Sequence, residues 1–277
     1  MRLLLLGARG MFGRDAVPWF QQAGYTVAGG DLPEVDITSP PSVARFLDAH
    51  PCEVVLNAAA FTDVDGAESR REEAFRVNAE GARVAAEACA ARGLLLVHLS
   101  TDYVFPGDRP EGYLPGDRPG PAANAYGESK LAGEEAIRAV LPPGRFLICR
   151  TQWLYGRHGR NFVETILALA RQRESLSVVD DQWGVPTWTL SLAPQISGLL
   201  RRGVRGYAHA VGGGGPVTWH RFAQEIVRLA GLSCTVKPCR TEEVPRPAPR
   251  PRHAWLRPDP SLPPPQPWNL DLARYLG

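Results

Sequence analysis

The sequence predicts an α/β fold with a doubly wound parallel sheet and a smaller C-terminal lobe. In the first half of the 277-residue chain, short and almost purely apolar runs alternate with amphipathic helical stretches. This alternation is typical of parallel strands that helices cover on both faces. After about residue 150 the alternation stops, and helical segments and a proline-rich tail follow. We therefore expect a sheet domain over residues 1–150 and a substrate-binding lobe over most of 151–277. A segment at about 189–213 could return to the sheet domain.

Five apolar runs are the expected strands. They are Leu3–Leu6, Tyr25–Gly29, Glu53–Leu56, Leu94–Leu99 and Arg145–Cys149. The expected helices between them are Asp15–Gln22, Ser42–Ala49 and a long one over Glu68–Arg92, each with apolar residues at helical spacing. Right-handed crossovers between parallel strands place such helices on the two faces of the sheet.

The second half predicts three helices and an irregular tail. The helices are Asn161–Gln172, Ser191–Arg201 and Trp219–Ala230, with Thr218 as a candidate N-cap of the last. The tail from Val244 to Pro267 is crowded with proline and arginine, which favours extended or irregular backbone. The apolar residues that follow it could dock on a core. The tail is therefore expected to be an ordered loop over the smaller lobe.

Composition excludes several classes of partner. A net charge of +2 is too small to indicate a nucleic-acid or membrane-surface partner. No apolar run approaches the roughly 20 residues that span a bilayer, and the first run is too short for a signal peptide. The five cysteines show no C-x-x-C spacing, so neither a disulfide framework nor a zinc site is expected. A cytoplasmic protein is the expectation.

A glycine-rich turn directly follows the first expected strand. It reads Gly7-Ala-Arg-Gly10-Met-Phe-Gly13 and opens a helix, which is where backbone N–H groups can bind a pyrophosphate. Asp31, after the second strand, is placed to bind an adenosine ribose and would repel a 2′-phosphate. Arg9 in the turn would favour that phosphate. These two residues leave the choice between NADH and NADPH open.

The sharper signal is Tyr126-Gly-Glu-Ser-Lys130. Residues four apart share one face of a helix, so the phenol and the ammonium can reach the same cleft. A nearby cation lowers the pKa of a tyrosine. Lys130 is one of only two lysines, and Ser100-Thr101 ends the preceding strand, at the sheet edge where such folds bind ligands. The alternative is an exposed helix face without chemistry.

These motifs together resemble the extended short-chain dehydrogenase/reductase superfamily, with Thr101, Tyr126 and Lys130 matching its Ser/Thr–Tyr–Lys triad. Within that superfamily the chain resembles the dTDP-4-dehydrorhamnose reductases over essentially its whole length. The segments that carry the resemblance are Asn57–Glu68, Ser100-Thr-Asp-Tyr-Val-Phe-Pro106, Tyr126–Glu134, Arg150–Tyr155, Leu176–Thr187 and Thr218-Trp-His220. The resemblance implies reduction of the 4-keto group of dTDP-4-dehydro-L-rhamnose by NADPH or NADH to give dTDP-L-rhamnose.

The resemblance also implies roles for residues. Lys130 would bind the nicotinamide ribose and lower the pKa of Tyr126, Tyr126 would protonate the sugar O4, and Thr101 would hydrogen-bond to that oxygen. The expected cofactor-binding residues are Gly7, Arg9, Gly10, Met11, Phe12, Gly13, Asp31, Asp36, Ile37, Ala58, Ala59, Ala60, Thr62, Asn78, Tyr126 and Lys130. The expected substrate-binding residues are Val64, Thr101, Asp102, Tyr103, Trp153 and Arg250. Plain core packing is the alternative for Trp153.

Two departures and two other functions stay open. Some relatives dimerise through carboxylate-held Mg²⁺, but Pro186–Pro194 contains no carboxylate here, so no metal site is expected. Ala254-Trp255-Leu256 replaces the usual Ser-x-Leu of the late loop, which removes a hydroxyl. A homodimer is compatible with the sequence. The alternative functions are another nucleotide-sugar reductase, epimerase or dehydratase, or a non-catalytic regulatory subunit of methionine adenosyltransferase, against which the complete triad argues.

Overall fold

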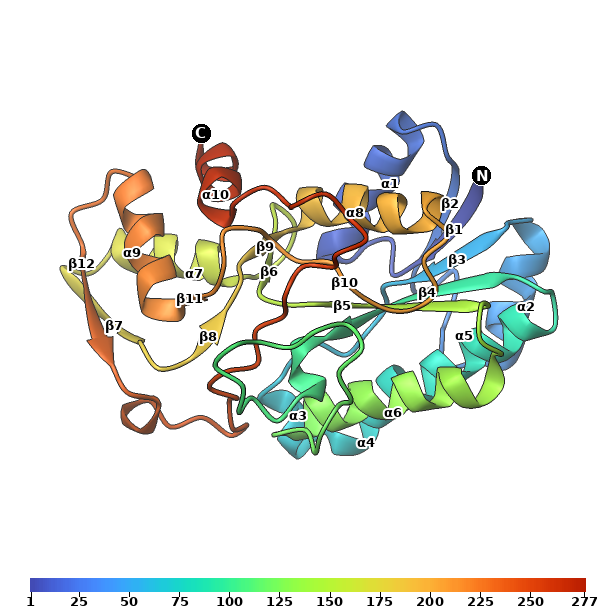
Figure 1. Ribbon diagram of the computed structural model, residues 1–277, viewed down its shortest axis with the longest axis horizontal. Coiled ribbons are helices and arrows are strands. Elements are labelled where there is room, and N and C mark those ends of the chain that lie inside the picture. Colours follow the sequence, from blue (N-terminus) through green and yellow to red (C-terminus); the bar gives the residue numbers. More distant parts are fainter.

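A six-stranded, all-parallel sheet forms the centre of the computed structural model, which describes residues 1–277 (Figure 1). Its order is β10-β5-β4-β3-β1-β2. The strands are β1 (Arg2–Leu6), β2 (Thr26–Gly30), β3 (Val54–Asn57), β4 (Leu95–Thr101), β5 (Phe146–Thr151) and β10 (Gly206–His209). The five strands expected from the apolar runs are present within one or two residues of their expected ends. The sixth, β10, pairs with β5 and lies at the edge of the sheet.

Helices cover both faces of this sheet, as the α/β prediction requires. Helices α1 (Met11–Gln22) and α8 (Thr189–Arg201) cover one face, and α2 (Pro40–Ala49), α5 (Gly81–Ala90) and α6 (Ala125–Val140) cover the other (Figure 1). Each face has its own apolar core, in which alternate strand residues such as Leu3 and Leu5 on one side and Leu4 and Leu6 on the other are fully buried. The fold class is therefore confirmed.

The single helix expected over Glu68–Arg92 is wrong. The chain forms α3 (Gly66–Ser69), leaves helical geometry at Arg70 (φ −114°, ψ 45°) and resumes as α4 (Arg71–Phe75). A π-helical turn, η1 (Arg76–Glu80), then leads into α5. Apolar periodicity cannot reveal these changes, because Ala74, Val77 and Val84 keep their helical spacing through them. The π turn carries Asn78 inward, where it is 1% exposed.

The second lobe has its own core. It contains α7 (Phe162–Ala170), α9 (Trp219–Leu229) and α10 (Trp268–Leu276), with β7 (Ser175–Val179) paired in parallel with β12 (Thr235–Cys239). Two short pairs complete it: β6 (Leu154–Tyr155) with β9 (Thr187–Trp188), and β8 (Trp183–Gly184) with β11 (Val217–Thr218). Asn161 and Thr218 cap α7 and α9 by accepting hydrogen bonds from backbone N–H groups of the first turn.

The proline-rich tail is an ordered loop. After the short turn η3 (Thr241–Glu243), residues 244–267 contain no helix or strand, but Ala254 and Leu256 are buried. The backbone N–H of Tyr113 donates to the carbonyl of Trp255, which ties the tail to the segment after a second short turn, η2 (Asp102–Val104). The final helix α10 then docks through Leu272 and Tyr275. The tail thus lies across both parts of the molecule (Figure 1).

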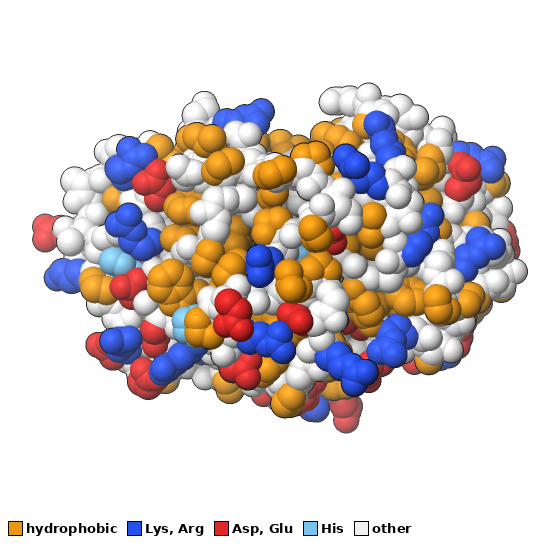
Figure 2. Space-filling model, in the orientation of Figure 1, with side chains coloured by type: hydrophobic (Ala, Val, Ile, Leu, Met, Phe, Trp, Pro, Cys, Tyr) orange, Lys and Arg blue, Asp and Glu red, His pale blue; other side chains and the backbone are white.

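The surface carries charges of both signs. Figure 2 shows acidic and basic side chains interspersed over one face, in keeping with the small net charge. All five cysteines are free thiols. None of the helices has the length and apolar character that crossing a membrane requires.

Candidate active site

A cleft of about 770 Å³ lies at the carboxyl ends of the central strands. Parallel α/β sheets bind ligands at this edge because the strands end there in loops and helix N-termini. The cleft contains 19 of the 22 residues predicted from the sequence to form the site: Gly7, Gly10, Met11, Phe12, Gly13, Asp31, Asp36, Ile37, Ala58, Ala59, Ala60, Thr62, Val64, Thr101, Asp102, Tyr103, Tyr126, Lys130 and Trp153. The predicted residues are therefore brought to one place.

The glycine turn forms the floor at the N-terminus of α1. Gly7 has φ +84°, and a Cβ there would lie 2.6 Å from the backbone nitrogen of Ala59. A Cβ on Gly13 would lie 2.3 Å from the carbonyl oxygen of Gly7. Gly10 is the N-cap of α1, no side chain caps the helix, and Gly10, Met11 and Phe12 of its first turn line the cleft. Such a helix terminus favours a phosphate group.

Asp31 and Arg9 take different positions. Asp31 lines the cleft, and its carboxylate accepts hydrogen bonds from the backbone N–H groups of Arg9 (3.1 Å) and Leu32 (2.8 Å). The Arg9 side chain is not part of the cleft wall. Its guanidinium donates to the carbonyl of Leu32 at 2.9 Å and pairs with Glu34. The Asp31 carboxylate is thus fixed in the cleft wall, whereas the Arg9 guanidinium is held outside it by Leu32 and Glu34.

Thr101 and Asp102 end β4 and are buried. The hydroxyl of Thr101 donates to Asp102 Oδ1 at 2.9 Å and accepts from the backbone N–H of Tyr103 at 3.2 Å. Burial raises the pKa of Asp102 to about 7, although its hydrogen bonds from Thr101 and from backbone N–H groups oppose the shift. Thr101 can donate to a substrate oxygen only by giving up its bond to this carboxyl group.

Tyr126 and Lys130 lie one turn apart on α6, whose N-cap Asn124 accepts a hydrogen bond from the N–H of Gly127. Burial and the Asp102 carboxylate raise the pKa of Tyr126, and the Thr101 hydroxyl lowers it. Burial lowers the pKa of Lys130 to about 8, while Glu134 raises it. The sequence predicts that Lys130 lowers the pKa of Tyr126, whereas burial and the Asp102 carboxylate act on that pKa in the opposite direction.

Trp153 follows β5 and takes a strained conformation. Its φ is +46°, the one non-glycine residue with a positive φ, and such strain is often kept at functional sites. Its ring stacks on Trp219 with centroids 3.4 Å apart, and Gly184 also lies against the ring, where a Cβ would approach within 2.1 Å. The ring lines the cleft and also packs on the second lobe.

Three predicted residues lie outside the cleft wall. One is Arg9, whose guanidinium pairs with Glu34. Asn78 lies behind the wall: its amide pairs with both backbone groups of Phe61 and donates to Ser129 Oγ at 2.9 Å. The guanidinium of Arg250 donates to Asp65 Oδ1 at 2.9 Å and to the carbonyl of Ala248 at 2.7 Å. The structure gives Asn78 and Arg250 bracing contacts, which the sequence alone did not reveal.

Other residues of the cleft wall were not predicted from the sequence. The missed residues are Leu32, Val35, Thr38, Phe61, Glu73, Val77, Leu99, Ser100, Thr151, Gln152, Leu154, Gly159 and Arg160. Arg160 is an exposed cation at the cleft and could have been found as a charged residue in the glycine-containing loop after Tyr155. Most of the others are apolar or lie next to predicted residues, and no pattern distinguishes them from core residues.

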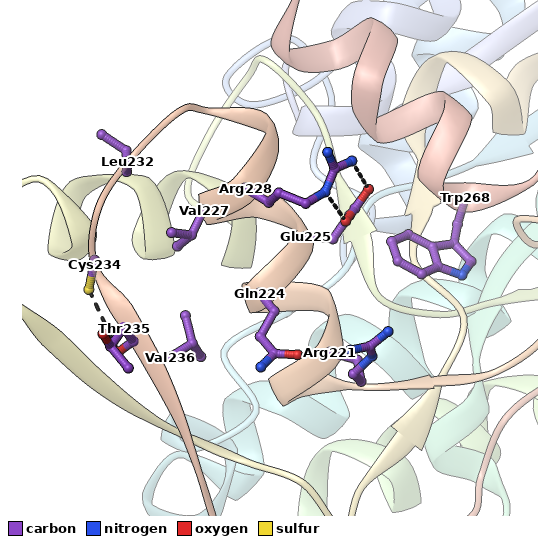
Figure 3. Close-up of a pocket in the computed structure, with 10 residues that line it drawn as sticks. All are labelled: Arg221, Gln224, Glu225, Val227, Arg228, Leu232, Cys234, Thr235, Val236 and Trp268. Carbon is purple, nitrogen blue, oxygen red and sulfur yellow. Dashed lines mark hydrogen bonds and ion pairs between the residues drawn. The ribbon is translucent and has the colours of Figure 1, made fainter.

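A second hollow, of about 700 Å³, lies in the smaller lobe beside α9, β12 and Trp268 (Figure 3). Its wall includes the ion pair of Arg228 with Glu225 and the thiol of Cys234. None of the residues predicted to bind cofactor or substrate lies there. No group of three or more His, Cys, Asp or Glu side chains could hold a metal ion anywhere in the chain.

The chain has the fold and the site of an extended short-chain dehydrogenase/reductase. Its parallel sheet carries a glycine turn at the N-terminus of α1, and one cleft brings together Thr101, Tyr126 and Lys130. The chain belongs to the RmlD substrate binding domain family, which it matches over residues 1–276.

The relatives agree with this membership. The chain is 41% identical over 261 residues to dTDP-4-dehydrorhamnose reductase of Streptomyces griseus, covering 92% of this chain and 85% of that protein. It is 41% identical over 256 residues to dTDP-4-keto-6-deoxy-D-glucose reductase of Streptomyces niveus, covering 92% and 88%. Among solved structures, dTDP-4-dehydrorhamnose reductase of Bacillus anthracis in complex with NADP matches at 36% identity and a TM-score of 0.93, covering 99% and 98%.

Proposed function

We propose that the protein reduces the 4-keto group of dTDP-4-dehydro-L-rhamnose to give dTDP-L-rhamnose, with NADPH or NADH as the reductant. The observation that carries the proposal is the convergence of the glycine turn with Thr101, Tyr126 and Lys130 in one cleft, in a chain whose relatives are named as reductases of dTDP-linked 4-keto sugars. The dinucleotide and the sugar would meet at the carboxyl ends of β1, β3 and β4.

The protein's residues fit a nicotinamide dinucleotide. A Cβ at Gly7 would collide with the backbone of Ala59 after β3, and a Cβ at Gly13 would collide with the backbone of the turn, so this close packing of turn, helix and strand end requires glycine at both positions. The uncapped N-terminus of α1 would bind the pyrophosphate, and Asp31 would accept hydrogen bonds from the adenosine ribose. Asp36, Ile37 and Ala58 to Ala60, with Thr62, would line the rest of the dinucleotide site. When bound, the nicotinamide supplies the hydride.

Tyr126 would hold and donate the proton. Its pKa is raised by burial, so the phenol is protonated at neutral pH and can give its proton to an oxygen that becomes negative. Lys130 would bind the nicotinamide ribose beside it. Thr101 would hydrogen-bond to the same oxygen after releasing Asp102. The sugar would contact Val64, Tyr103 and Trp153, with Asp102 next to them. Arg250 would stabilise the neighbouring segment through its ion pair with Asp65.

The division of labour between the lobes is part of the proposal. Residues 1–150, with α8 and β10 added from the region 189–213, would bind the dinucleotide, and most of 151–277 would bind the sugar nucleotide. The packing of α8 and β10 with the sheet core supports this boundary. We also propose a cytoplasmic location, supported by five unpaired thiols, which are typical of proteins in a reducing compartment.

The experiment supplies dTDP-4-dehydro-L-rhamnose with NADPH and, separately, with NADH, and follows the nicotinamide absorbance. The expected result is one cofactor oxidised per sugar reduced, with dTDP-L-rhamnose identified by its proton couplings. If the product is instead the epimer with the opposite configuration at C4, the protein is a reductase of different stereospecificity. Turnover of the sugar without net cofactor oxidation would indicate an epimerase, and no reaction with either cofactor contradicts the proposal.

A further inference from the structure

A buried chain of hydrogen bonds runs from the end of β3 to Lys130. The backbone N–H of Ala59 donates to Asn57 Oδ1 at 3.2 Å, and Asn57 Nδ2 lies 3.2 Å from His98 Nδ1. On the other side of the ring, His98 Nε2 lies 3.2 Å from Lys130 Nζ, which also donates to the carbonyl of Leu99 at 2.7 Å. Asn57, His98 and Lys130 are each at most 2% exposed, so these hydrogen bonds are shielded from bulk water.

The direction of every bond in this chain is fixed from one end. A backbone N–H can only donate, so the Asn57 atom facing Ala59 is the oxygen, and the atom facing His98 is the NH₂ group. His98 Nδ1 must therefore accept. A neutral imidazole that accepts at Nδ1 carries its hydrogen at Nε2, and this hydrogen points at Lys130 Nζ. Lys130 Nζ can accept it only through a lone pair, which an ammonium group does not have.

An ammonium group at Lys130 would place two donors against each other. If Lys130 donated to Nε2, the imidazole hydrogen would move to Nδ1 and face the NH₂ group of Asn57. Turning that amide would only move the conflict to the N–H of Ala59. A buried donor without an acceptor is destabilising, so the network opposes protonation of Lys130.

The other charged groups around Lys130 do not reverse this preference. Glu134, one turn further along α6, is its nearest anion, but its carboxylate accepts two bonds from Arg150 (3.0 and 2.7 Å) and one from Ser100 (2.6 Å). The guanidinium of Arg150 balances that charge. On the cleft side are the phenol of Tyr126 and the carboxyl group of Asp102. Burial lowers the pKa of both His98 and Lys130, in the same direction as the hydrogen-bond pattern.

We infer that Asn57 and His98 are positioning residues that disfavour the ammonium form of Lys130, and so lower the pH at which the proposed catalytic lysine becomes a cation. Tyr126 gains a cationic neighbour only when Lys130 binds a proton, and the lone pair then no longer accepts from His98 Nε2. Asn57 and His98 thus connect the end of β3, where the proposed cofactor-binding segment begins, to the charge on Lys130 beside Tyr126. The catalytic meaning of this device rests on the proposed reductase function, but the protonation state of Lys130 does not.

The test uses the full-length protein labelled with ¹³C and ¹⁵N in lysine. Because Lys130 and Lys237 are the only lysines, the spectrum has two side-chain ammonium or amine signals, and Lys237→Arg assigns them. Lys237 is exposed on β12 and is the internal control. The Lys130 Cε shift should titrate at least two pH units below that of Lys237. A titration of Lys130 alongside Lys237 would overturn the inference, whatever the activity of the enzyme.

Substitutions separate the hydrogen-bond pattern from simple burial. Asn57→Asp offers an acceptor to His98 Nδ1, so Nε2 can accept from an ammonium group, and the Lys130 midpoint should rise by at least one pH unit. His98→Phe should also raise it, and Asn57→Asp should add little in the His98→Phe background. An equal rise in both backgrounds would mean a direct charge effect, and no rise would mean burial alone; either result contradicts the inference.

Discussion

Replacing Asp102 by asparagine should stabilise the protein, and only above mildly acidic pH. The side chain is 3% exposed, and burial raises its pKa to about 7. An unfolded aspartate has a pKa of about 3.9, so between about pH 4 and pH 7 the native state holds a proton that the unfolded state has lost. The free energy of unfolding of the native protein therefore falls as pH rises through this window and is constant above it with respect to this group.

The size of the effect follows from the two pKa values. About three pKa units at 1.36 kcal/mol each give a destabilisation of up to about 4 kcal/mol above pH 7. Asparagine keeps an oxygen that can accept a hydrogen bond from the Thr101 hydroxyl. Because asparagine does not ionise, it removes this pH-dependent destabilisation. We expect Asp102→Asn to exceed the parent in unfolding free energy by about 2–4 kcal/mol at pH 8, with the difference disappearing toward pH 4.

Urea denaturation of both proteins between pH 4 and pH 8.5 measures this difference directly. The exposed Asp48→Asn is the matched control and should show no comparable pH-dependent gain, because its carboxylate is solvated and only pairs with Arg92 at the surface. A difference between Asp102→Asn and the parent that is the same at every pH, or of opposite sign at pH 8, would refute the reasoning from burial.

Three other substitutions test separate parts of the structure. Asp31→Ala should raise kcat/KM for NADPH relative to NADH, because a carboxylate near the ribose repels a 2′-phosphate; an unchanged ratio would show that Asp31 does not face the ribose. Gly13→Ala should weaken NADPH binding in a fluorescence titration by about tenfold or more, whereas Gly116→Ala, with open space around it, should not. Glu134→Gln should lower the unfolding free energy by about 3–5 kcal/mol in urea, because it leaves the buried Arg150 cation unpaired; a loss below about 1 kcal/mol would show that the pair is dispensable.

Much of the fold could be predicted because the signals were local. Near-continuous apolar runs located five of the six strands of the central sheet, and their alternation with helices predicted the layered sheet. The glycine turn and the Tyr126–Lys130 spacing predicted residues that line one cleft, because each is a short motif beside a strand end or on one helix face. The capping residues Thr218 and Asn124 show the same locality, although only the first was predicted.

The parts that could not be predicted depend on three-dimensional contacts. The break at Arg70 and the π turn that directs Asn78 inward leave the apolar spacing unchanged. Whether Arg250 faces the cleft or Asp65 is decided by a contact between residues 185 positions apart. The raised pKa of Tyr126 reflects burial and the nearby Asp102 carboxylate, which the spacing of residues on a helix does not contain.

Tyr126 is the proposed proton donor of the reductase, and the turnover of the Tyr126→Phe variant measures this role. Phenylalanine removes only the hydroxyl from a side chain that packs edge-on against Tyr103, so cofactor binding and the fold should be retained. We expect turnover of dTDP-4-dehydro-L-rhamnose to fall by about 10²–10⁴-fold, with the dissociation constant for NADPH nearly unchanged. Turnover close to that of the unmodified protein would contradict the account.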